Sequence, residues 1–530
     1  MLSYIIKKLK LYIYFFFGDK NSKAYIDFQK KKWLLNKNNK LNQGTILVDF
    51  FQNYPFIHLW SYLVNFLSVK KSLDINYFYF PLYNNFITKI KFHRNYLKAI
   101  YKSFNVSCGI DEINIKKDPK IEYFAKKKFK KIKTKKNLLN FKYKNILLGD
   151  LVYDSYLRAN FKCTVELNDI KLFNLFRRSI YIFEEIEKYI KNNNVKFIIP
   201  SHIQYVQYAL IVRIACRHNI KVIKLHSKDW GNTKFRLTLI DREQPHENGN
   251  EYYNFRKIFG KLKDKKQKRL IGKKILLNRI LGKKDKTISY MKENEYKIQY
   301  NKKYLNQFAE KKIAVVFCHC FFDAPHKYRT MIFEDFYEQI KFLSKIAKSR
   351  KDLIWIFKRH PNEISENDKI YLNEFQNNEN IYYIKDELNN YDLLKLNIQF
   401  GITNHGTVGH EFAYLNIPII NTGDNPHINY NFNFHAKNRK EIVKKIDFIL
   451  KNRKKINLKK SKIEEFAYMY YFYYKNLYGE VDFKLDKYLS TKDYNYNTTS
   501  KIFNNYIKND YKFDSLAKRY VNNFFLKNKI

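Results

Sequence analysis

The segment from Thr403 to His427, TNHGTVGHEFAYLNIPIINTGDNPH, constrains the fold more than any other stretch of the chain. One apolar run, IQFGIT, leads into it, and a second, IPIINTG, closes it; a glycine-containing turn and a short helical pattern lie between. A strand, a helix and a second strand in this order predict a parallel crossover unit. The turn also suits a phosphate, because backbone N–H groups and the helix dipole favour negative charge there. A tight turn whose glycines serve geometry alone is the alternative.

The same order of strand, helix and strand recurs in both halves of the chain. Apolar runs alternate with segments whose apolar residues recur every three to four positions, which is the helical spacing. We therefore predict two Rossmann-like α/β domains that face each other across a cleft, the arrangement called GT-B. The predicted strands lie at 45–51, 75–83, 144–148, 195–202, 220–226, 312–320, 352–361, 381–386, 398–403 and 417–423. The predicted helices include 55–69, 169–193, 204–218, 334–349, 366–375 and 441–450.

A basic stretch separates the two α/β blocks. It contains KLKDKKQKRLIGKKILLNRILGKKDK, which has helical spacing but only a thin apolar stripe. We expect a connector or surface insertion, with a lipid- or nucleic-acid-binding arm as the alternative. The predicted division is a basic, aromatic N-terminal helix (1–40), an N-terminal Rossmann-like domain (41–235), a basic helical connector (236–310), a C-terminal Rossmann-like domain (311–455) and a C-terminal helical segment (456–530).

The formal net charge of +51 bears on the partners of the chain. Lys far outnumbers Arg, and Asn, Ile, Tyr and Phe are also abundant, which is the pattern of a sequence drawn towards A- and T-rich codons. No zinc finger, aromatic RNA-binding motif or basic recognition helix accompanies the charge, so we do not expect nucleic-acid binding. Attraction to phosphorylated substrates or to anionic lipid headgroups is the simpler use of such a surface.

Cysteine usage and hydropathy bear on the compartment. The five Cys form no CxxC pair, which indicates a reduced, cytoplasmic protein without a structural zinc site. Cys318 and Cys320 flank His319, a possible metal fragment, but alternation along a strand favours both thiols pointing into the core. The apolar run from Leu11 to Gly18 is shorter than the ~20 residues that span a bilayer. We expect a soluble protein or one peripheral to the inner face of the membrane, with the N-terminal helix either packed or lying in the interface.

Unusual polar residues follow the predicted strands. Ligands of open parallel sheets bind beyond the carboxyl ends of the strands, so these residues are the candidates for chemistry. A single histidine at such a position is usually structural, but here histidines recur across both blocks. The strand-end residues are Asp150, Asp154, His202, His226, His319, Asp323, His326, Lys358, Arg359, His360, His405, Asp424 and His427.

Two of these elements carry a family resemblance. KRHPNE, followed some distance later by GTVGHEFAYLNIP, resembles the nucleotide-binding half of bacterial capsule and surface-polysaccharide glycosyltransferases. It is also similar to CDP-glycerol glycerophosphotransferases and capsular Kdo transferases. GDLVYDSYLR and CHCFFDAPHKYRTMIFEDFY resemble further elements of a capsule-biosynthesis group. The resemblance covers 311–455 well and 144–226 moderately.

The resemblance implies roles for particular residues. His360 would contact the phosphate or nucleotide of the donor, with Lys358 and Arg359 supplying positive charge. The amides of Gly406 and Thr407, with the Thr407 hydroxyl, would hold the diphosphate. One residue, Glu411, would accept hydrogen bonds from the ribose. Related enzymes often carry a serine pair or Ser-Gly-Gly at the turn, so the nucleotide base is left open, and a simple strand-ending turn is the alternative for KRHP.

Glycosyl transfer needs a base for the acceptor hydroxyl and stabilisation of the departing phosphate. No DxD-type motif ends a predicted strand, so we predict catalysis without a metal and without a cofactor other than the nucleotide-sugar donor. Asp323 is the first candidate for the base because its loop would face the cleft. The other candidates for the catalytic group are Asp150, Asp154, His319 and His326.

We therefore predict a glycosyltransferase that moves a sugar from a nucleotide-sugar to a growing capsular or surface polysaccharide, or to a lipid-linked glycan acceptor. Two alternatives stay open. One is a nucleotide-sugar epimerase of the same fold. The other is a non-catalytic polysaccharide-assembly or nucleic-acid-binding protein that kept the fold. The sugar, the acceptor, the stereochemical outcome and the oligomeric state do not follow from the sequence.

Overall fold

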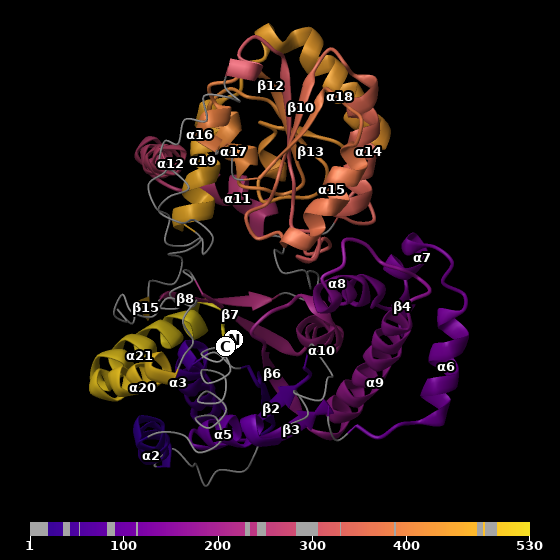
Figure 1. Cartoon of the computed structure of the whole chain (residues 1–530). Coiled ribbons are helices and arrows are strands. Elements are labelled where there is room, and N and C mark those ends of the chain that lie inside the picture. The colour runs from indigo at the N-terminus through magenta and orange to yellow at the C-terminus, as the bar shows by residue number, and fades with distance from the viewer. Residues whose placement is uncertain are drawn as a thin grey trace.

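Two large sheets, one mainly and one wholly parallel, are each covered by helices (Figure 1). The predicted pair of Rossmann-like domains is therefore confirmed. The computed structural model describes residues 20–34, 43–51, 54–81, 91–112, 115–227, 234–240, 251–281, 306–328, 330–385, 388, 390–473, 481–482 and 496–530. The aromatic run predicted before residue 20 and the parts of the connector at 241–250 and 282–305 lie outside the described residues.

The first sheet has the strand order β15-β8-β7-β6-β1-β2-β3. Strands β7 to β3 in this order run parallel, while β8 and β15 add to the β7 edge in antiparallel pairing. The parallel centre is buried on both faces, which explains its runs of Ile, Val and Leu. The strands are β1 (Thr45–Asp49), β2 (Asp74–Tyr79), β3 (Val106–Asp111), β6 (Val195–Ile199), β7 (Lys221–Ser227), β8 (Lys234–Ile240) and β15 (Val481–Asp482).

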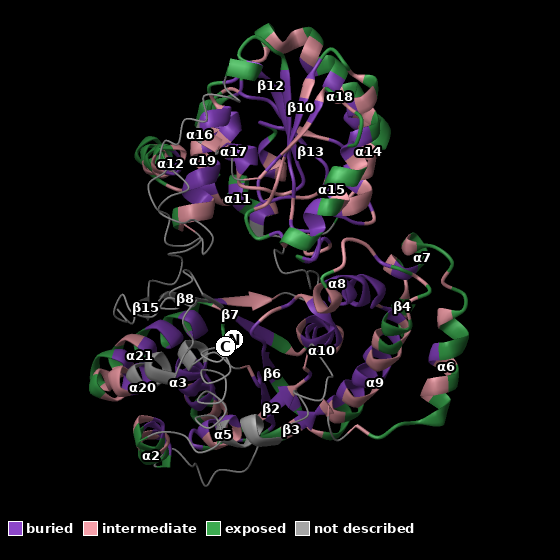
Figure 2. Ribbon diagram, viewed as in Figure 1, coloured by how far each residue is buried: buried purple, intermediate pink, exposed green. Residues whose placement is uncertain are grey.

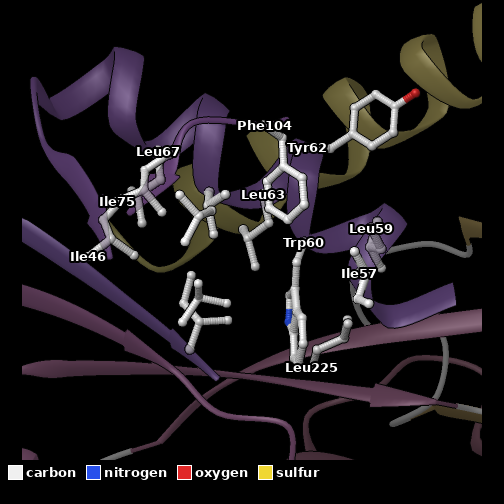
Figure 3. Close-up of a cluster of buried hydrophobic side chains, with 14 of the residues drawn as sticks. Ile46, Ile57, Leu59, Trp60, Tyr62, Leu63, Leu67, Ile75, Phe104 and Leu225 are labelled. Carbon is white, nitrogen blue, oxygen red and sulfur yellow. The ribbon is translucent and has the colours of Figure 1, made fainter. Parts of the chain in front are cut away.

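Helices cover both faces of this sheet. On one face the core includes Trp60 and Leu63, which Figure 3 shows directed at the strands that carry Ile46 and Leu225. C-terminal helices α20 and α21 complete that face by packing on α2 and α3. The helices of this face are α2 (Lys20–Leu34), α3 (Tyr54–Lys71), α5 (Lys91–Lys102), α20 (Tyr496–Lys508) and α21 (Asp510–Lys527). Those of the other face are α6 (Pro119–Phe129), α7 (Lys135–Leu139), α8 (Gly149–Asn160), α9 (Ile170–Asn192) and α10 (Tyr205–Arg217).

The second sheet is wholly parallel, with the order β11-β10-β9-β12-β13-β14. Helices α14, α15 and α18 lie on one face and α16 and α17 on the other (Figure 1). The strands are β9 (Ile313–Phe317), β10 (Ile354–Lys358), β11 (Ile381–Ile384), β12 (Ile398–Thr403), β13 (Ile419–Asn421) and β14 (Phe434–His435). The helices are α14 (Phe336–Ser349), α15 (Asp368–Phe375), α16 (Asn390–Leu393), α17 (Val408–Tyr414) and α18 (Arg439–Asn452).

The described part of the predicted connector packs on the second domain. Helices α11 (Glu251–Gly260) and α12 (Lys265–Ile280) contact α19 (Lys460–Ala467) and the π-helical turn η6 (Tyr468–Tyr473). Their aromatic and aliphatic side chains form one buried cluster with Tyr414 of α17 and Tyr430. Figure 2 shows the buried faces of α17 and α19 meeting there, while α12 exposes its outer face. The thin apolar stripe of α12 is thus sufficient to hold it against the domain.

The two domains meet where α8 contacts the loop that follows β9. Cys320 and Phe322 of that loop pack with the core of the first domain. The Tyr153 hydroxyl donates a hydrogen bond to Asp335, the N-cap residue of α14. Asp335 is fully buried. The junction therefore combines apolar packing with buried polar contacts.

One predicted strand does not join a parallel sheet. Residues 142–147 form a separate two-stranded hairpin, β4 (Lys142–Tyr143) and β5 (Ile146–Leu147). Asp150 and Asp154, which were expected just beyond a sheet strand, instead lie inside α8. Among the described residues, no helix is long and apolar enough to cross a membrane.

Candidate functional site

Three histidines from three strand ends come together at the carboxyl edge of the second sheet. His319 follows β9, His360 follows β10 and His405 follows β12. Because β9 lies between β10 and β12, the three strand ends are neighbours. The ring centroids of His319 and His405 are 4.3 Å apart, and those of His319 and His360 are 6.5 Å apart. The structure thus groups candidates that are scattered in the sequence.

Neighbouring side chains fix the orientation of these rings. Phe336 stacks on His319 with 4.8 Å between ring centroids, and Tyr328 lies 4.7 Å from His405. The amide of His405 donates to Nε2 of His319 over 3.4 Å, and the Thr403 hydroxyl lies 3.2 Å from the same atom. A nitrogen that accepts these bonds leaves the ring proton of His319 on Nδ1.

The three rings are uncharged at neutral pH. Burial lowers the pKa of His319 and of His405 well below the usual value, and it lowers the pKa of His360 to about 4. The pKa of each is lowered further by the positive charge of Lys327. The cluster can therefore offer N–H donors and lone pairs, but its formal charge comes from the lysine.

Lys327 was not anticipated from the sequence. It lies in the loop after β9, and its Nζ is 3.8 Å from a carboxylate oxygen of Asp323. Its side chain is mostly buried, whereas that of Asp323 is 51% exposed. The signal that could have found it is its position directly after His326, in a loop already rich in strand-end candidates.

Lys358 and Arg359 point to other partners. The Lys358 ammonium donates to the carbonyl oxygen of Leu388 over 2.6 Å. Arg359 donates to Asp368 over 2.8 Å and to the carbonyl oxygen of Glu363 over 2.5 Å. Both cations thereby take part in the packing around β10 and α15, and Arg359, like Lys327, also lowers the pKa of His360.

The predicted diphosphate turn lies next to the histidine cluster. The Gly406 amide donates to the Thr403 hydroxyl over 3.2 Å. A Cβ at Gly406 would lie 2.8 Å from that hydroxyl and 3.3 Å from Val408, so only glycine allows this close approach. Thr407 occupies the N-cap position of α17 without a side-chain capping bond. Its hydroxyl is thus not engaged in capping the helix.

Glu411 is held by the connector. The Arg279 guanidinium of α12 approaches its Oε1 atom at 2.8 Å and 2.9 Å. Arg279 also lies over the ring of Tyr471, 4.7 Å from its centre. A ribose that binds Glu411 would have to share this carboxylate with Arg279.

The remaining candidates lie at the junction of the domains. His326 Nδ1 is 2.6 Å from a carboxylate oxygen of Asp154, and the His326 amide donates to the other oxygen over 3.1 Å. Asp150 forms a two-pronged ion pair with Arg213 of α10, with both contacts at 2.7 Å. Asp150 and Asp154 are buried. These pairs tie α8 to its surroundings.

A second polar group lies at the carboxyl edge of the first sheet. Asp49 ends β1, and Ser201 and His202 follow β6, the neighbouring strand. The Ser201 hydroxyl donates to Asp49, and His202 Nδ1 is 2.9 Å from that hydroxyl. His202 is among the predicted strand-end residues, but Asp49 and Ser201 were missed. The available signal was an aspartate within the otherwise apolar run TILVDFF.

No set of three or more His, Cys, Asp or Glu in the described ranges could hold a metal ion. Both thiols that flank His319 are buried, Cys318 in the second domain and Cys320 against the first. Burial raises the pKa of Cys318 and of Cys320, so both are uncharged. They act as packing residues here.

The chain matches no known protein family and no curated protein in sequence. In structure it is similar to a putative UDP-N-acetylglucosamine 2-epimerase from Listeria monocytogenes, at 11% identity, with 80% of this chain and 90% of that chain covered and a TM-score of 0.25. It is also similar to the UDP-GlcNAc 2-epimerase from Neisseria meningitidis bound to UDP-GlcNAc, at 10% identity, 80% and 97% coverage and a TM-score of 0.25. The S. aureus MnaA–UDP structure matches at 10% identity, 80% and 94% coverage and a TM-score of 0.25.

These matches correct the predicted function. The similar structures named above are epimerases or a UDP complex, and none is described as a glycosyltransferase. Transfer of a sugar to a capsular or lipid-linked acceptor is therefore not retained. The alternative left open by the sequence, a nucleotide-sugar epimerase of the same fold, is taken up as a proposal below. At these identities and TM-scores the matches assign no role to any residue, so the roles proposed below rest on the geometry of the site.

Proposed function

We propose that the chain is an enzyme that binds a nucleotide-sugar and changes the configuration of its sugar, as nucleotide-sugar epimerases do. The observation that carries the proposal is the convergence of His319, His360 and His405 with Lys327 beside the turn at Gly406. Such a group suits a diphosphate, because one ammonium balances its charge and ring and backbone N–H groups supply directed donors.

The surroundings of the cluster suit a bound phosphate. The rings are neutral and desolvated, so a bound anion would meet N–H donors in a setting where hydrogen bonds are electrostatically strong. Asp323 projects from the same loop, and its charge raises the pKa of His360 against the larger effect of burial. Asp323 remains a candidate for proton transfer at this site, and Glu411 for binding the ribose.

A screen of nucleotide-sugars tests this function. The melting temperature of the protein is measured with UDP-, GDP-, CMP- and CDP-linked sugars. NMR then follows each nucleotide-sugar for a change in the configuration of its sugar. We expect one nucleotide class to stabilise the protein and to be converted. Absence of any shift, together with salt-sensitive binding of RNA, would contradict the proposal.

Two variants locate the site. Lys327→Met should weaken binding of the nucleotide-sugar that the screen finds to be converted by about tenfold to a hundredfold, since a charged hydrogen bond contributes roughly 1.5–3 kcal/mol. Lys345→Met is the control, because Lys345 is an exposed lysine of α14. Equal affinities in the two variants would place the diphosphate elsewhere.

We also propose peripheral contact with an anionic membrane. The basis is the segment 116–136, which includes α6 and exposes ten lysines. Tyr123, also on α6, is 68% exposed. Lysines beside an exposed aromatic ring suit a surface of anionic headgroups.

A further inference from the structure

The connector brings an arginine close to the predicted diphosphate turn. Helix α12 lies alongside α19 and also contacts α17, the helix that follows the turn (Figure 1). Gly272 allows the close approach of α12 to α19, and Leu276 is fully buried in the cluster that the connector shares with the second domain. Arg279, near the end of α12, is also buried. Its guanidinium is therefore carried by a helix that packs firmly on the domain.

Two contacts fix the position of this guanidinium. It lies over the ring of Tyr471, 4.7 Å from the ring centre, and the Tyr471 hydroxyl lies 2.7 Å from Nε2 of His410 on α17. Nε and Nη2 of Arg279 approach the same carboxylate oxygen, Oε1 of Glu411, at 2.9 Å and 2.8 Å. The Arg279 side chain is 4% exposed and that of Glu411 is 13% exposed. An ion pair so shielded from water holds its geometry more firmly than an exposed one.

The two oxygens of Glu411 are used differently. A carboxylate has about four lone-pair sites, two on each oxygen. The two N–H groups of Arg279 occupy the sites of Oε1, whereas Oε2 accepts no hydrogen bond from the described residues. Oε2 is also not sealed from solvent. A ligand at this point would therefore meet an acceptor with two unused sites.

Glu411 lies one helical turn beyond the predicted diphosphate turn. Its amide donates to the carbonyl oxygen of Thr407, the residue after Gly406. One turn of helix advances about 5.4 Å, and helical side chains lean back towards the N-terminal end. A nucleotide whose diphosphate contacts the turn and Lys327 would thus bring its pentose close to the carboxylate. The pentose of a ribonucleotide carries two adjacent hydroxyl groups, which matches the two unused sites of Oε2.

We infer that Arg279 is a positioning residue that makes the nucleotide site specific for a ribonucleotide. Arg279 holds Glu411 by Oε1, so that Oε2 faces the hydroxyl groups at C2′ and C3′ of the ribose. A 2′-deoxyribonucleotide supplies one hydroxyl instead of two and leaves a site of the shielded carboxylate unfilled, which lowers its affinity. Sugars linked to thymidine diphosphate are thereby disfavoured. This role of Arg279 rests on the proposed function, because that function supplies the nucleotide.

Isothermal titration calorimetry of the full-length protein tests this specificity. The ligands are the nucleotide of the nucleotide-sugar that the screen finds to be converted, and the 2′-deoxy form of that nucleotide. We expect the wild type to bind the ribonucleotide about tenfold more tightly, since a hydrogen bond to a charged group contributes at least that factor. Equal affinities for the two nucleotides would overturn the role of Arg279.

Arg279→Met tests the positioning itself. Without the guanidinium, Glu411 is no longer held by Oε1, so the ratio of the two affinities should fall towards one, mainly through weaker binding of the ribonucleotide. Arg269→Met is the matched control, because Arg269 lies on the same helix but pairs with Glu465 of α19 over 3.5 Å. It should keep the ratio of the wild type. An unchanged ratio in Arg279→Met, or an equal loss of the ratio in both variants, would show a merely structural role and overturn the assignment.

Two further variants keep the test decisive if melting curves show that Arg279→Met does not fold. In Glu411→Gln the amide oxygen should face Arg279, which places an NH₂ group, unable to accept a hydrogen bond, where Oε2 was. The ratio should then fall to about one. Arg279→Lys keeps the charge but replaces two donors in a rigid fork by one compact ammonium, so the ratio should fall part of the way. An unchanged ratio in either folded variant overturns the assignment.

The outcomes separate the two proposals. Conversion of a nucleotide-sugar by a wild type that binds both forms of the nucleotide equally overturns the role of Arg279 and leaves the proposed function intact. Binding of no nucleotide and conversion of no nucleotide-sugar overturn the proposed function and the role of Arg279 together.

Discussion

Asp49 shows how a single residue can make stability depend on pH. Its pKa is about 7 in the folded chain against 3.8 for an unburied aspartate. Between these values the folded protein holds a proton that the unfolded chain has lost. Stability therefore falls as pH rises through this window, and the full cost is present above pH 7. One pKa unit corresponds to about 1.4 kcal/mol, so the cost at high pH is roughly 4 kcal/mol.

Asp49→Asn should remove this cost. We expect the variant to match the wild type near pH 4 and to be more stable by up to about 4 kcal/mol at pH 8, measured as denaturation midpoints across that range. Asp27→Asn is the control, because the side chain of Asp27 is 65% exposed. Parallel pH curves for wild type and Asp49→Asn would show that Asp49 is ionised throughout.

At the scale of residues, the sequence predicted which polar strand ends lie together better than it predicted the contacts of each side chain. His319, His360 and His405 gather because parallel strands end at one edge, which periodicity reveals. Lys358 and Arg359 have other partners, because the carbonyl oxygen of Leu388 and the Asp368 carboxylate accept their hydrogen bonds. These hydrogen bonds depend on how the folded chain packs, so no local sequence pattern predicts them.

Helix α12 packs closely on α19 at Gly272. A Cβ on Gly272 would lie 2.0 Å from the carbonyl oxygen of Glu464 in α19. Alanine normally stabilises a helix interior relative to glycine by about 1 kcal/mol. At this position, by contrast, Gly272→Ala should lower the free energy of unfolding by about 1–3 kcal/mol, because α12 and α19 must separate to make room for the methyl group.

Gly260→Ala is the control for this element. Gly260 ends α11, and a Cβ there would meet no atom within 4 Å. Thermal denaturation should show a stability loss for Gly272→Ala and none for Gly260→Ala. A gain of stability in both would mean that α12 does not pack closely on α19.

At the scale of elements, long periodic segments were predicted well and short or edge elements were not. The helix expected over 169–193 appears as Ile170–Asn192, since its apolar spacing is sustained over many turns. The apolar run at 144–148 forms part of a hairpin because it pairs with the neighbouring Lys142–Tyr143 segment. A short apolar run does not reveal its partner, so its sheet could not be assigned.

At the scale of the whole molecule, the α6 segment is one of the strongly basic surfaces of the described chain. Replacing Lys126, Lys127, Lys128, Lys130 and Lys131 by Gln should weaken binding to vesicles of phosphatidylserine and phosphatidylcholine, since each basic residue near such a surface contributes about 1 kcal/mol. The expected loss in vesicle sedimentation is at least a hundredfold in affinity. Binding of the wild type should also weaken as salt rises.

The matched control changes the same number of charges on the second domain. It replaces five exposed lysines in and just after α18, namely Lys440, Lys444, Lys451, Lys454 and Lys455, by Gln. An equal loss of vesicle binding in both variants would show that net charge alone is responsible. No loss in the α6 variant would contradict the proposed surface.

The junction between the domains depends on the pair His326 and Asp154. Burial alone would lower the pKa of His326, but the charge and hydrogen bond of Asp154 outweigh it and raise that pKa. The contribution of His326 to stability is therefore complete below pH 6.5 and is lost as pH rises through its higher pKa in the folded state. Burial also raises the pKa of Asp154, so the carboxylate of the pair is lost at low pH. We expect small-angle X-ray scattering to show a larger radius of gyration for the wild type at pH 9 than at pH 6. His326→Gln should remove that pH dependence, whereas His218→Gln, within the first domain, should keep it. Asp154→Ala should destabilise the protein by about 3–5 kcal/mol, the cost of leaving a buried partner unpaired. An unchanged radius in the wild type would show that the apolar packing of Phe322 holds the domains without the pair.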